Sequence, residues 1–217
     1  MAAAAALSSS VAFAAPIFSN PIQLPAFGDC SFSTTCAGMF GRGNDFAAQK
    51  FTLSNTTVLT AADFIELDFG TTPSDVNWGL IAADGTGGSP GTILAAGTDT
   101  LSALSVGSSN GYNLSQMSWN LGTVALGPGD YYLAMQGISS TEFTYLAQGQ
   151  LASGAYETED GGLTWTQNYE GIPSVAVDLF GDVVNNGVPE PSTWLMGILG
   201  FGAIGAMLRR RPRHVAA

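Results

Sequence analysis

The chain has very few basic residues, histidines and cysteines. Its 217 residues include six Lys and Arg, one His and two Cys, against 17 Asp and Glu. Arg42 and Lys50 are the only basic residues before residue 209, whereas 16 of the acidic residues lie between Asp29 and Asp182. Nucleic-acid binding depends on Lys and Arg that neutralise phosphates, so we expect no nucleic-acid partner. Acidity with little Lys is also typical of soluble secreted domains.

The shortage of histidine limits the catalytic chemistry. The one histidine, His214, lies close to the C-terminus, so the body of the chain offers no His to activate a Ser or Cys nucleophile. Neither a phosphate-binding loop nor a dinucleotide fingerprint is present. A glycosidase pair stays formally open because carboxylates are plentiful, but they are spread over expected strands and turns. We therefore expect that the protein is not an enzyme.

The two ends of the chain read as targeting segments. Residues 1–15 form a short apolar run that ends in an Ala-x-Ala cleavage pattern, which predicts a signal peptide, although no basic residue precedes the run. An Ala-rich buried helix is the alternative. Near the other end, residues 192–208 carry no charge and would span about 25 Å as a helix. This predicts a single transmembrane helix, with a basic tail at 209–217 on the cytoplasmic side.

The motif before the apolar segment gives the sharpest signal in the sequence. Pro189-Glu190-Pro191, the apolar segment and the cluster Arg209, Arg210 and Arg211 follow one another in order at the chain end. This arrangement resembles the PEP-CTERM sorting signal, with a plain tail anchor as the alternative. The resemblance implies handling by an exosortase, a membrane-embedded protease, with cleavage near the Pro-Glu-Pro motif. It also implies a bacterium that makes exopolysaccharide and biofilm.

An exported protein can form disulfides, and Cys30 and Cys36 are close enough in sequence to close a small loop. Free thiols are the alternative, and no further ligands complete a zinc set. We expect no cofactor, and calcium is the one ion left open. Hard oxygen ligands could come from Asp84 in its Gly-rich loop, or from Glu157, Glu159 and Asp160 together.

The region 16–184 is predicted to be one extracytoplasmic all-β domain, joined by a linker at 185–191 to the helix. Apolar residues alternate with others over 65–69, 76–80, 131–136 and 174–179, which is the period of half-buried strands. Turn-forming segments rich in Gly and Pro separate these runs. We predict an antiparallel jelly-roll-like β-sandwich of about eight to ten strands, with an immunoglobulin-like sandwich as the alternative.

Three segments of this region are similar to a domain that PEP-CTERM proteins often carry. They are the Phe-Thr-Leu strand at 49–53, the Gly-Gly-Ser-Pro-Gly hairpin at 87–94 and the Pro-Gly-Asp-Tyr-Tyr strand at 126–133. Their motifs are mostly turn chemistry. The resemblance therefore bears on the fold more than on the function.

One local motif fits the Asp-box pattern of sialidase-type propeller blades. Thr158, Asp160, Gly162 and Trp165 occupy its characteristic positions, but the motif occurs once, whereas propellers repeat it. We interpret it as a hairpin staple in which the Asp accepts turn amides and the Trp packs beneath. A catalytic or sugar-contacting role is the alternative.

Together these features predict an exported, exosortase-sorted structural or interaction protein of the cell surface or extracellular matrix. Its expected partners are the export machinery, the exosortase, the membrane before processing and exopolysaccharide. The alternative function is a carbohydrate-binding module. For that function exposed aromatics would be needed, and the candidates are Trp119, Tyr131, Tyr132, Tyr145, Tyr156, Trp165 and Tyr169.

Overall fold

The computed structural model describes residues 15–22, 37–40, 45–68, 72–109, 112–138, 144–167, 173–184 and 198–199. The chain divides into a compact unit that ends at Val183 and a second unit from Val184 onward. In the second unit, the described residues Ile198 and Leu199 are helical.

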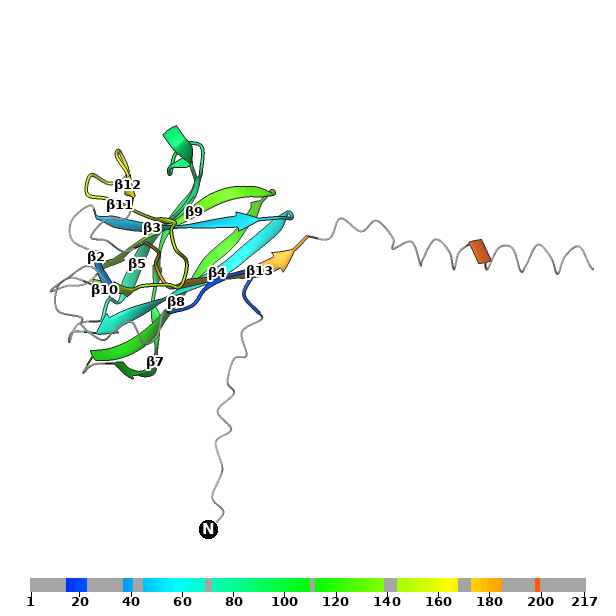
Figure 1. The fold of residues 1–217 in the computed structure, drawn as a ribbon. Helices are drawn as coiled ribbons and strands as arrows, with labels where there is room; N and C mark the ends of the chain where they lie inside the picture. Colours follow the sequence, from blue (N-terminus) through cyan, green and yellow to red (C-terminus); the bar gives the residue numbers. More distant parts are fainter. Residues whose placement is uncertain are drawn as a thin grey trace, which may run out of the picture. The chain divides into compact units, whose positions relative to one another are not determined.

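The first unit is built from β-strands (Figure 1). The described residues form thirteen strands and one short 3₁₀ helix, which are β1 (Phe18–Asn20), β2 (Ala37–Phe40), β3 (Phe46–Leu53), β4 (Thr57–Asp68), β5 (Asp75–Ala82), η2 (Thr86–Gly88), β6 (Ile93–Thr100), β7 (Ser102–Ser109), β8 (Tyr112–Leu126), β9 (Gly129–Ile138), β10 (Thr144–Ala147), β11 (Ala155–Thr158), β12 (Thr166–Gln167) and β13 (Val177–Val183).

The strands form two antiparallel sheets. In the six-stranded sheet the order is β12-β11-β3-β9-β5-β6. In the seven-stranded sheet, β4 lies between β8 on one side and both β13 and β10 on the other; β7 extends β8, while β1 and β2 extend β13 and β10. The prediction of an all-β fold made of antiparallel sheets is therefore confirmed.

A single apolar core lies between the sheets. Phe51, Leu80 and Leu133 of the six-stranded sheet pack in one cluster with Phe64 and Leu179 of the seven-stranded sheet, and all five side chains are buried. Side chains two residues apart share a face of a strand, and the alternation read from the sequence correctly places Leu80, Leu133 and Leu179 on this inner face. The strand count exceeds the expected eight to ten because several strands have only two to four residues, too few to show a period.

The sequence predicts strands with one buried and one exposed face, but the outer face of the six-stranded sheet is partly buried as well. On β9, Tyr132 and Ala134 point away from the core cluster yet are only 1% and 3% exposed, because they pack in a separate apolar cluster with Trp165 and Tyr156. The hairpin that carries Trp165 therefore covers part of the outer face of the six-stranded sheet and borders the candidate site.

On β4 the predicted alternation is wrong. Glu66 lies on the same face as the core residue Phe64 and is fully buried, whereas Leu67, predicted to face the core, packs in a separate cluster with Leu114.

Several predicted features lie outside the described residues. These are the signal segment at 1–14, both cysteines of the expected disulfide, the Pro-Glu-Pro motif, and the cluster of Arg209, Arg210 and Arg211. Within the part of the chain that is described, no helix has the length and apolar character needed to cross a membrane.

Candidate binding groove

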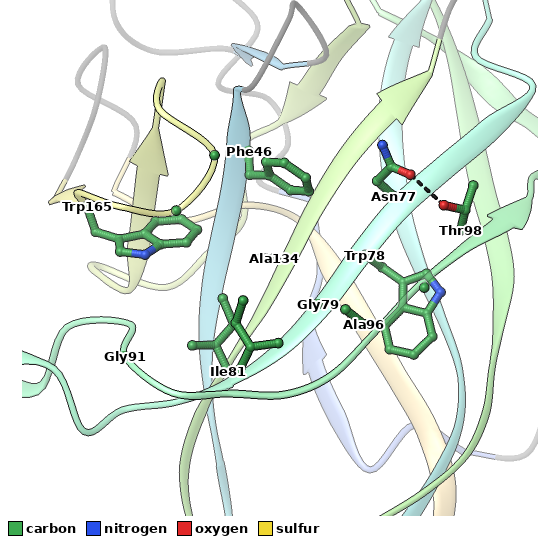
Figure 2. A pocket seen from close by; sticks show the side chains of 14 residues that line it. Phe46, Asn77, Trp78, Gly79, Ile81, Gly91, Ala96, Thr98, Ala134 and Trp165 are labelled. Carbon is green, nitrogen blue, oxygen red and sulfur yellow. Dashed lines mark hydrogen bonds between the residues drawn. The ribbon is translucent and has the colours of Figure 1, made fainter.

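A groove of about 410 Å³ lies on the outer face of the six-stranded sheet (Figure 2). Its lining comes from strands β3, β5, β6 and β9, from the loop before β6, and from the hairpin that carries the Asp-box motif. This volume falls within the range of about 300–1,000 Å³ that is usual for small-molecule sites. The residues that line it are Phe46, Asn77, Trp78, Gly79, Ile81, Gly91, Ile93, Ala96, Gly97, Thr98, Ala134, Gly161, Gly162 and Trp165.

Small side chains form the floor of the groove. Gly79 on β5 pairs with Ala134 on β9 and with Ala96 on β6, so the three residues form one row across the sheet. Neighbouring strands lie about 4.8 Å apart, so this row is roughly 10 Å long. Larger side chains at these positions would fill the space. The register of the sheet therefore creates the groove by aligning three small residues.

A polar wall runs along one side of this floor. The wall lies two residues along each strand from the floor row. There, Asn77 on β5 pairs with Gln136 on β9 and with Thr98 on β6. The Thr98 hydroxyl donates to Asn77 Oδ1 at 2.6 Å, and Asn77 Nδ2 donates to Gln136 Oε1 at 2.9 Å (Figure 2). These bonds fix the orientation of the Asn77 amide. Its second amide hydrogen has no partner among the described residues, so Asn77 keeps one donor for a ligand.

Aromatic side chains line the part of the groove formed by β3 and the Asp-box hairpin. Trp165 and Phe46 are partly buried and pack against the cluster of Tyr132, Ala134 and Ile81 (Figure 2). Trp165 comes from the Asp-box hairpin, whereas Phe46 begins β3. Both rings belong to the groove lining. An aromatic wall and an amide side wall give the groove an amphipathic character.

The Asp-box motif holds the hairpin that presents Trp165. Asp160 Oδ1 accepts the backbone N–H groups of Leu163 and Thr164, both at 2.9 Å, and the Thr158 hydroxyl at 2.6 Å. Asp160 Oδ2 accepts the Thr164 hydroxyl at 2.6 Å. Hydrogen bonds from the Thr158 and Thr164 side chains are the main reason that the pKa of Asp160 is well below its ordinary value. The carboxylate is thus ionised and internally bonded.

Backbone geometry explains why glycine occupies two positions of the motif. Gly161 and Gly162 have φ angles of 75° and 95°, in the left-handed region that favours glycine. A Cβ at Gly162 would lie 3.6 Å from Cζ2 of Trp165. The turn therefore brings its backbone against the indole, and both glycines join the groove lining.

The Gly-rich loop at the other border of the groove is also fixed. Asp84 accepts the Thr92 backbone N–H and the Thr92 hydroxyl, each at 2.7 Å, and these bonds lower the pKa of Asp84. The Tyr132 hydroxyl donates to the carbonyl oxygen of Gly88 at 2.7 Å, and burial raises the pKa of Tyr132. The loop is thereby attached to the outer face of the sheet.

The acidic residues considered for calcium make other contacts. Asp84 bonds to Thr92, and Asp160 bonds within its own hairpin. In the described ranges, no group of three or more His, Cys, Asp or Glu side chains has the arrangement to hold a metal ion.

Most of the described aromatic residues considered for sugar contact pack against other rings, and one lines the groove. Trp119 is 3% exposed and packs against Phe64, with ring centroids 5.8 Å apart. Tyr131 packs against Phe51, and Tyr156 meets the edge of Tyr132. Of the candidates whose side chains are described, Trp165 is the one that lines the groove. The side chains of Tyr145 and Tyr169 lie outside the described residues.

The sequence did not point to Asn77, Thr98 or the small floor residues. Each is an ordinary strand residue in its own segment, and they meet only through the pairing of β6, β5 and β9. The one local signal is small size, since Gly79, Ala96 and Ala134 stand where larger residues are common in strands.

Comparison with known families finds the PEP-CTERM protein-sorting motif at residues 187–211. The match covers the Pro-Glu-Pro motif, the apolar segment and the arginine cluster identified above. Comparison with curated proteins finds no match. The motif marks the chain as an exported protein that is sorted to the cell surface through the exosortase route.

Proposed function

We propose that this chain is a structural or interaction protein of the cell surface or extracellular matrix, and that its β-domain acts by binding rather than by catalysis. The observation that carries the proposal is the sorting motif at residues 187–211. The last described strand, β13, ends at Val183, so the motif begins four residues after the β-domain. The motif directs the chain out of the cell, and the β-domain is what it delivers.

The chemistry of the groove supports binding over catalysis. Among the described residues, none of the side chains that line the groove is ionisable. General acid–base catalysis needs a group that exchanges a proton within hydrogen-bond reach of the reacting atom. Hydrogen-bond donors and acceptors fixed beside an aromatic wall are typical of recognition sites.

The sorting step can be tested by the intact mass of the protein from its native host, measured separately in membrane and medium fractions. We expect a species that starts near Ala15 and ends near Pro189-Glu190-Pro191. Replacing Glu190 and both prolines with Ala should leave the unprocessed chain in the membrane fraction. A wild-type species that retains residues 192–217 and stays in the membrane would contradict the proposal, because the tail would then be a plain anchor.

A second candidate, a carbohydrate-binding module of the cell surface, is favoured by one specific observation. The groove on the six-stranded sheet combines an aromatic wall, a fixed amide and a floor of small residues. The bacterial surface and matrix are rich in polysaccharide, so an exported binding domain would meet sugars in abundance.

A further inference from the structure

We propose that the groove over β9, β5 and β6 binds an uncharged pyranose unit of a polysaccharide, with the ring face against Trp165 and the hydroxyls toward Asn77 and Thr98. The inference rests on the proposed function as an exported binding protein and specifies its ligand class and site.

The charge of the protein disfavours an anionic ligand. The chain has a formal net charge of −11, and the described groove lining contributes no cation. Lys50, a basic residue of the six-stranded sheet, is paired with Asp130 at 2.9 Å and does not line the groove. An anionic ligand would meet the repulsion of the whole domain without a local ion pair in return. Uronic-acid and sulfated glycans are therefore disfavoured.

Polarity selects a ligand with one apolar and one polar side. The Trp165 and Phe46 rings offer an apolar surface, whereas Asn77 and Thr98, on strands farther from the Asp-box hairpin, offer hydrogen bonds (Figure 2). A purely apolar ligand would cover the amide and hydroxyl without replacing their contacts with water, which is unfavourable. A pyranose has C–H groups on its ring faces and hydroxyls around its rim. It can satisfy both walls at once.

The floor gives the ring room to approach. Gly79, Ala96 and Ala134 carry at most a methyl group, and Ala96 is exposed. The groove continues to β6, where Thr98 is exposed and Ile93 is 63% exposed. Within the described strands, β6 pairs only with β5 and forms an edge of the sheet. A polysaccharide could therefore enter with one residue and continue past the edge.

The walls are held before any ligand arrives. Asn77 is bonded to residues on both neighbouring strands, and Asp160 holds the hairpin of Trp165 with bonds to Leu163 and Thr164. Side chains that are already ordered lose little conformational entropy on binding. The groove is thus suited to a ligand that offers few contacts per sugar.

The test is isothermal titration calorimetry of the full chain, kept in a detergent without a sugar head group. The probes are neutral β-linked and α-linked gluco- and galacto-oligosaccharides, an oligogalacturonate as the charged counterpart, and a hydrophobic dye. We expect heat with at least one neutral oligosaccharide and none with the oligogalacturonate. Binding of the dye or the oligogalacturonate alone would overturn the proposal, as would no binding of any sugar at millimolar concentration.

Two variants localise the site. Ala96→Phe fills the floor from an exposed position and should lower affinity at least tenfold while the melting temperature stays close to that of the wild type. Thr98→Val removes one hydroxyl at nearly constant volume and should lower affinity severalfold. Leu163→Ala, on the Asp-box hairpin but 85% exposed and outside the groove, is the matched control and should bind as the wild type does. Sugar binding that Ala96→Phe leaves unchanged would place the site elsewhere and overturn the assignment.

This outcome can be separated from failure of the proposed function. Ala96→Phe should be exported and processed like the wild type in the intact-mass measurement. If the wild-type chain is processed but binds no sugar, only the glycan site is wrong. If the chain is neither exported nor processed, the proposed function itself fails, whatever the calorimetry gives.

Discussion

Asp63 on β4 lies directly opposite Asp178 on β13, in the middle of the seven-stranded sheet. Asp63 is 3% exposed, and its Oδ2 accepts a hydrogen bond from Gln116 Nε2. Burial raises the pKa of Asp63 to about 7; the bond from Gln116 opposes this shift, and the facing Asp178 adds to it. The folded protein therefore holds a proton that the unfolded chain releases near pH 4.

This buried carboxyl predicts that the free energy of unfolding decreases with pH. Between pH 4 and 7 the folded state binds more protons than the unfolded state, so stability falls across this window and levels off above pH 7. The loss from this group is on the order of 3 kcal/mol. Urea denaturation at pH 5 and pH 8 should show the difference in the free energy of unfolding.

Asp63→Asn provides the control for this pH dependence. The amide has similar shape and stays neutral, so the variant should be more stable than the wild type at pH 8 and about equal to it at pH 5. A wild-type stability that is flat or rising from pH 5 to 8, with no gain from Asp63→Asn at pH 8, would contradict the shifted pKa.

Two leucines test where the apolar core lies. Leu133 on β9 is fully buried in the cluster between the sheets, whereas Leu163 is 85% exposed. Leu133→Ala should lower the free energy of unfolding by about 2–5 kcal/mol, because it removes buried methyl groups and leaves a cavity. Leu163→Ala should change it by less than about 0.5 kcal/mol. Equal effects in urea denaturation would be inconsistent with the two-sheet core.

Gly181 marks an irregularity in the pairing of β4 and β13. The register shifts between Phe180 and Gly181, and a Cβ at Gly181 would overlap the carbonyl oxygen of Val58. Gly181→Ala should therefore cost about 1–3 kcal/mol of stability through backbone displacement. The control is Gly127→Ala, where an added Cβ meets no atom within 4 Å. A fully stable Gly181→Ala protein would argue against this close approach.

The sequence predicted the parts of this protein that depend on local order. Alternation placed Leu133 in the core because a strand has only two faces, and this side chain is fully buried. It could not predict that Tyr132, on the opposite face, is buried too. That burial depends on Tyr156 and Trp165, which come from a hairpin more than twenty residues away.

The groove also depends on contacts between distant segments, which the sequence could not predict. The bonds of the Asp-box hairpin join residues within seven positions of one another, so a sequence pattern can contain them. Gly79, Ala96 and Ala134 meet only through strand register. A shift of one residue in that register would send each side chain to the other face of its strand. No local pattern carries this information.

Calcium should have no effect on the stability of the β-domain. Both carboxylate oxygens of Asp84 accept hydrogen bonds from Thr92, and those of Asp160 accept bonds from Thr158, Leu163 and Thr164. A calcium ion would have to displace these donors to be bound. The melting temperature should be the same in millimolar calcium and in excess chelator. A rise of several degrees in calcium would show that an acidic site exists beyond these contacts.

The carboxylate of Asp160 should be needed to hold the Asp-box hairpin, and with it Trp165, in place. Asp160→Ala removes every acceptor for the Leu163 and Thr164 amides and for two hydroxyls, so the hairpin should loosen and Trp165 should lose its fixed position. We expect faster amide hydrogen exchange over residues 161–165 and a melting temperature a few degrees lower. Because the pKa of Asp160 is lowered, its contribution to stability is complete above pH 4 and is lost only as pH falls below that value. Glu159→Ala removes the same charge from the same hairpin without touching these bonds, and exchange should then stay slow. Equally fast exchange in both variants would mean that charge, rather than the hydrogen bonds of Asp160, holds the hairpin.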